Sequence, residues 1–274
     1  MSENLSGEKT PTPTKSADSY LFLGLPKSGK TTYFTVMAKT LQEIAAKGDS
    51  MKFRCENDAT REFVEAWWDT ISAPEPDWPE KTVTYDGGYE FSLLQRISLL
   101  GFMLPWGFGC RKASVCYHDY PGEAFQAAFG DVDNDAYKAQ ADQMRRQISQ
   151  ARGVFLLLDA DKLFNGADRK MLAKTTHKLF EFITKNNEKV KLAILFNKLE
   201  LFEGTEKNRN LEDEFRRLYD TACNWLPRNA RFFNVYPIGK LDLNDGCRKV
   251  PARKIAPRGV LAPVQWMIGF KGSF

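Results

Sequence analysis

The sequence predicts an α/β fold in which a mainly parallel central sheet lies between two layers of helices. Short apolar runs, typical of strands buried on both faces, recur along the chain. Stretches whose apolar residues have helical spacing separate the later runs. Strands that alternate with helices form parallel sheets, because each helix crosses one face of the sheet before the next strand begins. The 274 residues, 43% of them hydrophobic, are enough for one large domain with its own core.

The first expected elements flank a turn that contains glycine. Residues 20–24, YLFLG, are typical of a buried strand. A helix is expected over 31–47, because apolar residues from Phe34 to Ile44 recur at helical spacing and Gly48 follows as a natural stop. Further strands are expected at 51–55, 89–94, 113–118, 153–158, 190–196 and 231–236, further helices at 59–71, 137–151, 169–185 and 211–225, and a last helix or strand at 260–270.

Composition divides the chain into a tail, a main domain and an extension. Residues 1–17 are polar and lack apolar content, so we expect a flexible tail. The main domain is expected over 18–242, with an insertion at about 50–80 that carries its own helix and an apolar hairpin at about 95–112. Residues 243–274 are less regular and are expected to form a C-terminal extension that packs on the main domain.

Charge, cysteine content and hydropathy exclude several classes of protein. Lys and Arg number 39 and Asp and Glu 35, so the net charge of +4 is mild, and we do not expect a nucleic-acid partner. Five Cys without a Cys-x-x-Cys pair, and only two His, argue against a zinc site and a disulfide framework. The first residues do not form a secretion signal, and no apolar run approaches the ~20 residues that span a bilayer. We therefore expect a cytoplasmic protein without a transmembrane segment.

A phosphate-binding motif follows the first expected strand. The segment GLPKSGKT, which begins at Gly24, satisfies G-x-x-x-x-G-K-[ST] between a strand and a helix. Gly24 and Gly29 allow a close backbone approach, so that the amides of 27–31 can point at phosphate oxygens. Lys30 is expected between the β- and γ-phosphates and the Thr31 hydroxyl on Mg²⁺. The expected nucleotide-binding residues here are Gly24, Lys27, Ser28, Gly29, Lys30, Thr31 and Thr32. The alternative is a chance Gly-Lys-Thr turn that caps a helix.

A second motif, DYPGE, begins at Asp119 directly after the expected strand 113–118. An acid at the carboxyl end of such a strand is expected to lie beside the phosphate loop, where it can hold Mg²⁺ through water. Gly122 offers a backbone amide to a γ-phosphate, and a segment held only while that phosphate is present acts as a conformational switch. An ordinary Pro-Gly turn after a strand is the alternative.

The strand at 190–196 runs into Asn197, Lys198 and Glu200, which resemble the N-K-x-D motif of GTP-binding proteins. That resemblance implies that Asn197 braces the loops, that the stem of Lys198 lies along the base, and that Glu200 accepts from guanine N1–H and N2–H₂. Glu200 is one methylene longer than the usual Asp, and a surface turn is the alternative. After the next strand, residues 237–240 lie where GTP-binding proteins have their final loop, although Ser-Ala-Lys is the commoner sequence there. The resemblance implies that a backbone amide at Gly239 or Lys240 would meet guanine O6.

In this order, the motifs resemble those of the Ras-like P-loop GTPases over roughly 18–242, which makes that span a G domain. The resemblance implies a three-layer α/β/α P-loop NTPase fold, GTP or GDP with Mg²⁺ as ligands, and a protein effector or activator. The phrases YLFLGLPKSGKTT, DYPGE and VFLLLDAD look most like bacterial GTPases of the double-GTPase type. Proteins of that type are associated with multi-gene conflict or signalling systems.

The same resemblance implies a catalytic set. The family uses a Thr of the first switch on Mg²⁺ and the γ-phosphate, and Thr82 is the candidate, with Thr84 nearly as good. Glu123 stands where related enzymes often place a water-orienting Gln. The expected catalytic residues are thus Lys30, Thr82, Gly122 and Glu123, and the expected metal ligands are Thr31, Thr82 and Asp119.

The carboxylate of Glu123 also bears on whether the protein hydrolyses a nucleotide and how fast. A carboxylate beside a γ-phosphate favours slow intrinsic hydrolysis of GTP that a partner stimulates, for example by supplying an arginine. One alternative is a nucleotide-binding scaffold without significant turnover. Another is an ATP-using P-loop enzyme in which the NKLE segment is coincidental.

An apolar segment at 97–109 is the candidate docking surface. It is rich in aromatic and aliphatic residues, and it suits peripheral contact with a membrane or a protein partner. A hairpin turn folded over the core is the alternative. The basic residues at 248–258 could suggest nucleic-acid binding, but a solvated basic loop is the commoner explanation, and Asp242 and Asp245 dilute the charge. Nucleic acid is therefore not an expected partner.

Overall fold

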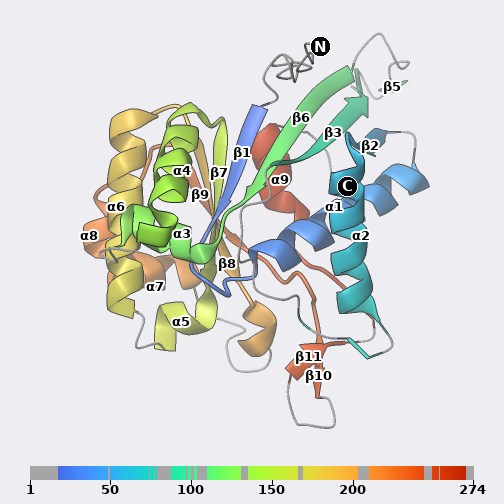
Figure 1. The fold of residues 1–274 in the computed structure, drawn as a ribbon. Helices are drawn as coiled ribbons and strands as arrows, with labels where there is room; N and C mark the ends of the chain where they lie inside the picture. Colours follow the sequence, from blue (N-terminus) through green and yellow to red (C-terminus); the bar gives the residue numbers. More distant parts are fainter. Residues whose placement is uncertain are drawn as a thin grey trace, which may run out of the picture.

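A seven-stranded sheet forms the centre of the computed structural model (Figure 1). The structure describes residues 18–48, 50–73, 75–76, 78, 88–96, 98–99, 102–103, 110–130, 135–165, 169–202, 210–243, 249–252 and 254–269. The strands lie in the order β2-β3-β6-β1-β7-β8-β9. Their bounds are β1 Asp18–Leu23, β2 Met51–Cys55, β3 Gly88–Arg96, β6 Cys110–Asp119, β7 Gly153–Asp159, β8 Lys191–Asn197 and β9 Ala230–Asn234.

Most of the sheet is parallel. Strand β1 pairs in parallel with β6 and β7, and β7, β8 and β9 continue the parallel order. Only β3 runs against the others, because it pairs antiparallel with both β2 and β6. The predicted α/β fold with a mainly parallel sheet is confirmed.

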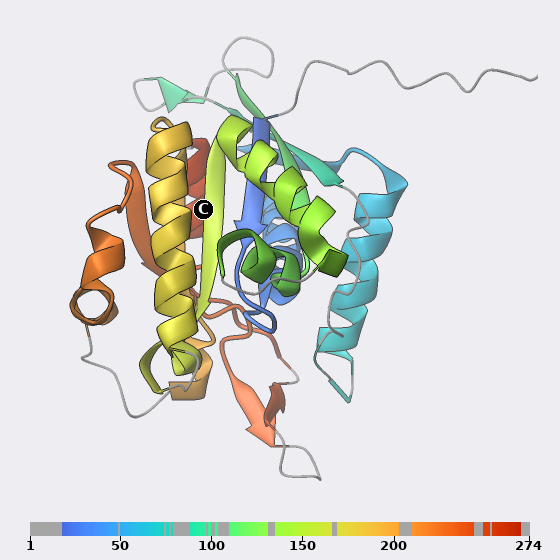
Figure 2. The same cartoon turned by 60° about the vertical axis from the view of Figure 1, so that its left-hand side comes forward.

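Helices cover both faces of the sheet. On one face lie α1 (Lys30–Lys47), α2 (Asp58–Ser72) and α9 (Leu261–Ile268). On the other lie α3 (Gly122–Phe129), α4 (Lys138–Gln150), α5 (Ala160–Asn165), α6 (Arg169–Asn186), α7 (Leu211–Leu218) and α8 (Asp220–Cys223). Figure 2 shows α3, α4 and α6 in front of the sheet and α1 behind it. Single 3₁₀ turns occur at Asp135–Tyr137 and Leu199–Phe202.

Two apolar layers, one on each face of the sheet, form the core. Successive residues of β1 point to opposite faces, so Leu21 packs in one layer and Phe22 in the other. The ring of Phe22 stacks on that of Phe155 with centroids 4.4 Å apart, and Phe34 of α1 stacks on Tyr117 at 3.8 Å. Burial on both faces explains why these strands are apolar without alternation.

The predicted elements lie on observed ones, but several short elements, including strands β10 (Leu241–Leu243) and β11 (Lys249–Pro251), were not predicted. Helices α3 and α5 were not predicted, because each is short and α3 begins inside the Pro-Gly turn of DYPGE. The prediction of one helix over 211–225 was wrong, since the chain leaves helical geometry at Tyr219, where φ is −125°. That residue is buried, and its hydroxyl donates to the carbonyl of Leu163 at 3.0 Å. Tertiary packing therefore divides the helix into α7 and α8.

The segments predicted as insertion, hairpin and extension all meet the central sheet. Strand β2 is its edge strand, and α2 follows β2. Strands β3 and β6 pair from Gly88–His118 to Arg96–Cys110, and β4 (Ser98–Leu99) pairs with β5 (Phe102–Met103) between them. In the C-terminal part, β10 (Leu241–Leu243) pairs with β11 (Lys249–Pro251), and α9 packs beside α1. The predicted tail 1–17 and the side chains of 97–109 lie outside the described residues.

Within the described residues, no helix combines the length and the apolar character that crossing a membrane requires.

Candidate functional site

Polar side chains gather at one edge of the sheet, where the parallel strands end. Asp119 ends β6, Asp159 ends β7 and Asn197 ends β8. In register, Asp119 lies beside Phe22 of β1, and Asp159 lies beside Asn197. Because the carboxyl ends of parallel strands meet at the same edge, these residues surround the loop that joins β1 to α1.

That loop needs glycine at two positions. At Gly29 the backbone is left-handed, with φ +84°, and an added Cβ would lie 2.5 Å from Asn197 Nδ2. At Gly24 an added Cβ would lie 2.6 Å from the carbonyl oxygen of Leu157 on β7. Because these two positions lack a side chain, the loop packs closely against β7 and Asn197 at the N-terminus of α1.

Lys30 begins α1 and folds back over the loop. Its Nζ donates to the carbonyl of Gly24 at 3.2 Å and to that of Leu25 at 3.5 Å. Burial lowers the pKa of Lys30, and the charges of Asp119 and Glu123 act in the opposite direction. A buried ammonium whose solvation has been removed gains most from an anionic ligand.

Thr31 and Asp119, beside Lys30, place two oxygen atoms that could coordinate a metal ion next to each other. The Thr31 hydroxyl donates to Asp119 Oδ2 at 3.2 Å, and both residues are buried. The part of the chain that the structure describes contains no cluster of three or more His, Cys, Asp or Glu suited to a metal. Magnesium at a nucleotide needs no such cluster, because it uses one or two protein oxygens together with phosphates and water. The predicted Thr82, like Thr84, lies outside the described residues.

Gly122 and Glu123 begin α3, and Gly122 lies against the loop that joins β1 to α1. An added Cβ at Gly122 would lie 2.1 Å from the backbone nitrogen of Pro26. Glu123 occupies the first turn of α3. Burial lowers the pKa of Lys30, and the charge of Glu123, after that of Asp119, partly opposes this effect, so the two side chains attract each other.

The segment after β8 is hydrogen-bonded directly to the loop that joins β1 to α1. Asn197 Nδ2 donates to the carbonyl of Ser28 at 2.7 Å. Lys198 has left-handed backbone, with φ +63°, and its Nζ donates to Asp159 Oδ2 at 2.7 Å. Glu200 lies in the following 3₁₀ turn and is 7% exposed.

The structure places the predicted final loop against the C-terminal segment. Gly239 has φ +82°, and an added Cβ would lie 1.9 Å from the carbonyl oxygen of Ala256. The carbonyl of Lys240 accepts from the amide of Ala252 at 3.1 Å. Contacts therefore join residues 24–32 to Asp119, Gly122 and Asn197. The contacts described for Gly239 and Lys240 are with Ala256 and Ala252 instead.

Asp159 is the residue of this site that the motifs did not single out. Its side chain is 7% exposed, and it is the acceptor for Lys198. The sequence does carry a signal for it, because an acid directly after the apolar strand GVFLLL resembles the position of Asp119 after 113–118. An acid that ends a buried parallel strand is placed at the ligand-binding edge.

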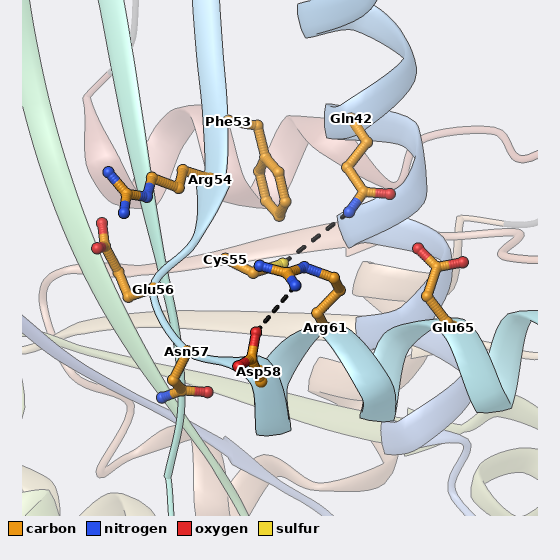
Figure 3. A pocket seen from close by; sticks show the side chains of 9 residues that line it. All are labelled: Gln42, Phe53, Arg54, Cys55, Glu56, Asn57, Asp58, Arg61 and Glu65. Atoms are coloured by element: carbon orange, nitrogen blue, oxygen red, sulfur yellow. Dashed lines mark hydrogen bonds and ion pairs between the residues drawn. The ribbon is translucent and has the colours of Figure 1, made fainter.

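A separate hollow of about 450 Å³ lies between α1, β2 and α2 (Figure 3). Gln42 Nε2 lies 3.9 Å from Cys55 Sγ, and Arg61 pairs with Asp58 at 2.9 Å. The lining residues are Gln42, Phe53, Arg54, Cys55, Glu56, Asn57, Asp58, Arg61 and Glu65. None of them belongs to the predicted site, and the mixture of both charge signs selects no class of ligand.

Comparisons with known proteins give structural likeness alone. No protein family model matches the chain, and neither does any curated protein. The GTPase-like domain of S. cerevisiae Ski7 is similar in structure, both bound to GDP and inorganic phosphate and bound to GTP. The first has a TM-score of 0.48 at 15% identity, and the second 0.47 at 14%. Each covers 92% of this chain, which spans only 49% and 50% of theirs.

Proposed function

We propose that this protein is a guanine-nucleotide-binding switch that hydrolyses GTP to GDP. The observation that carries the proposal is the hydrogen bond from Asn197 Nδ2 to the carbonyl of Ser28 at 2.7 Å. It joins the base-reading motif to the phosphate-binding motif, although the two are 169 residues apart. A chance surface turn after β8 would not be expected to form a hydrogen bond with the phosphate-binding motif.

The site also contains buried polar atoms that could form hydrogen bonds with a nucleotide. Two buried oxygens, Ser28 Oγ and Asn197 Oδ1, have no hydrogen-bond partner among the described residues. Buried polar atoms are nearly always paired in native proteins, so polar ligand atoms are natural partners for them. The ammonium of Lys30 and the loop amides would hold the phosphates.

The donor set fits Mg²⁺. The Thr31 hydroxyl and the Asp119 carboxylate are hard oxygen ligands, which Mg²⁺ prefers, and they already lie 3.2 Å apart. Thr82 is the proposed third protein ligand. When bound, the ion would offset negative charge on the phosphates.

Selection of guanine is assigned to Glu200. A carboxylate accepts hydrogen bonds from the N1–H and N2–H₂ of guanine, whereas adenine presents no such donor pair. Lys198 would place its stem along the base. Gly239 and Lys240 complete the proposed nucleotide site through a backbone amide toward guanine O6.

Hydrolysis would depend mainly on positioning and electrostatics, with water as the nucleophile. In the proposed catalytic set, Lys30 stabilises charge on the phosphoryl oxygens, Gly122 donates its amide, Glu123 polarises the water and Thr82 closes the site. Because Lys30 offsets Glu123, the carboxylate can lie near the phosphates. We expect slow intrinsic turnover that a protein activator stimulates, and an arginine supplied by a partner can be worth about 10³–10⁵ in rate.

The biological setting is proposed by resemblance to bacterial double-GTPase-type proteins. We propose a cytoplasmic protein of a signalling or defence-type system, with a protein effector or activator as its partner. The apolar segment 97–109 is the proposed docking surface, either for that partner or for a membrane surface, and nucleic acid is not an expected partner.

The nucleotide preference is tested by calorimetric titration of the nucleotide-stripped protein with GDP and with ADP, both with Mg²⁺. We expect GDP to bind at least about 100-fold more tightly, a difference of about 2.7 kcal/mol. Glu200→Ala should reduce that ratio at least tenfold, because the guanine donors lose their acceptor. Equal affinity for the two nucleotides in the wild-type protein would contradict guanine selection and favour an ATP-using enzyme.

Single-turnover hydrolysis of bound GTP tests the enzymatic part. We expect conversion to GDP that is slow in the isolated protein and that Glu123→Ala slows further, because that variant loses the group that polarises water. GTP binding should be retained by the variant. Wild-type protein that binds GTP but does not hydrolyse it, either alone or with a candidate activator protein, would support the nucleotide-binding scaffold instead.

A further inference from the structure

We propose that Asp159 is a positioning residue for the nucleoside half of the site. It would hold the side chain of Lys198 so that the methylene stem, and not the ammonium, meets the base. This inference rests on the proposed function, because it concerns the same nucleotide site. It adds an acid that lies outside the four sequence motifs.

The carboxylate of Asp159 is fixed at both oxygens. Its Oδ2 accepts from Lys198 Nζ at 2.7 Å, and its Oδ1 accepts from the backbone amide of Asp161 at 3.1 Å. The side chain is 7% exposed and that of Lys198 is 30% exposed. A buried carboxylate with a partner on each oxygen cannot swing away, so it sets where the lysine ends.

The other end of the lysine is fixed by its backbone. Lys198 has φ +63°, a left-handed conformation that an L side chain rarely adopts. The preceding Asn197 is held by the carbonyl of Ser28, and it pairs in register with Asp159 across β7 and β8. The unusual backbone angle thus directly follows a residue held on two sides, and the Lys198 side chain reaches the end of β7, where its Nζ donates to Asp159.

Between these two fixed ends, the lysine stem passes over the phosphate loop. The Cε of Lys198 lies 3.9 Å from the position that a Cβ would occupy at Gly29. At that separation the stem lies in van der Waals contact range of the loop at Gly29. The stem runs from the base motif, along Gly29, to Asp159.

Their charge environments distinguish Lys198 from Lys30. The ammonium of Lys198 is paired with Asp159, so it contributes little net charge toward a phosphate. The ammonium of Lys30 is buried against the carbonyls of Gly24 and Leu25, with the two acids Asp119 and Glu123 nearby. Lys30 is consequently the phosphate ligand, and Lys198 is left to act through its apolar stem.

The test compares Asp159→Ala with wild type by two titrations, one with GDP and one with inorganic tripolyphosphate, which occupies only the phosphate half. We expect GDP affinity to fall about tenfold, equivalent to about 1.4 kcal/mol, and tripolyphosphate affinity to stay unchanged. Asp159→Asn keeps the shape of the side chain and should lose less. Asp161→Ala is the matched control, because this neighbouring acid is exposed and contributes its backbone amide in either form.

A double-mutant cycle identifies the path of the effect. If Asp159 acts through Lys198, the Asp159→Ala/Lys198→Ala protein should bind GDP no more weakly than Lys198→Ala alone. Additive losses would overturn the positioning role. An equal fall in GDP and tripolyphosphate affinity, in both Asp159 variants, would show a structural role and would also overturn it.

The failure of this inference is separable from that of the proposed function. Wild-type protein that binds GDP tightly, with Asp159→Ala binding it equally well, would reject only the role of Asp159. Wild-type protein that binds tripolyphosphate but discriminates against GDP would reject the proposed function and this inference together. Thermal melting of each variant without ligand shows whether it is folded before either titration is interpreted.

Discussion

Replacing Lys30 with methionine is expected to abolish guanine-nucleotide binding, with a loss of at least about 100-fold in affinity, equivalent to about 2.7 kcal/mol. Methionine keeps an apolar stem of similar length and removes the ammonium that would contact the phosphates. Hydrogen bonds to charged groups contribute about 1.5–3 kcal/mol each, so the loss of one such set is enough for this effect. Calorimetric titration with GDP and Mg²⁺ measures it.

The same variant should fold as well as wild type. Burial is the main cause that lowers the pKa of Lys30, so the charge of Lys30 is disfavoured in the nucleotide-free protein. Removing this charge should therefore not lower the melting temperature. Lys47→Met, at the far end of the same helix and 79% exposed, is the matched control and should bind GDP normally. Tight GDP binding by a folded Lys30→Met protein would refute the phosphate-loop assignment.

Gly122→Ala is the second change with a large expected effect. The new Cβ would lie 2.1 Å from the nitrogen of Pro26, 2.5 Å from its Cα and 2.6 Å from the carbonyl carbon of Leu25. All three are backbone atoms, so the start of α3 and the phosphate loop must separate. We expect the free energy of unfolding to fall by about 1–3 kcal/mol, as overpacking does elsewhere. GDP affinity should fall about tenfold, because the loop is displaced.

Urea denaturation and GDP titration measure the two effects. Gly48→Ala is the control, because its nearest heavy atom, Ser50 Oγ, is 4.0 Å from the added Cβ and its φ of −151° suits any residue. Its stability should change by no more than about 0.5–1 kcal/mol, and in the favourable direction. If Gly122→Ala is as stable as Gly48→Ala and binds GDP normally, the close contact between α3 and the phosphate loop is not needed for stability or for nucleotide binding.

Local patterns made much of the fold predictable. The strand before Gly24 and the helix after Gly29 depend on residues close in sequence, since helical spacing and glycine turns are local properties. Strand β7 and the strand 113–118 were recognisable for the same reason. Short helices were not, because α3 and α5 have too few turns to show a period and are stabilised by packing on the sheet.

Contacts between distant segments were not predictable in this way. The break between α7 and α8 follows from the burial of Tyr219 against Leu163, and nothing in the local spacing announces it. The pairing of β2 and β3 in an antiparallel edge depends on how the sheet is assembled. The close approach of Gly122 to Pro26 arises because β1 and β6 are neighbours.

The sequence by itself determined the class of fold, and it supplied the predicted phosphate-binding motif with Lys30 and Thr31 and the two further motifs at Asp119 and Asn197, since each depends on residue types at short spacing. Only the tertiary structure decided that Thr31 meets Asp119, that Asn197 holds the phosphate loop and that Asp159 joins the site as the partner of Lys198. The physical reason is that parallel strands bring their carboxyl ends to one edge, and the strand order determines which side chains become neighbours there.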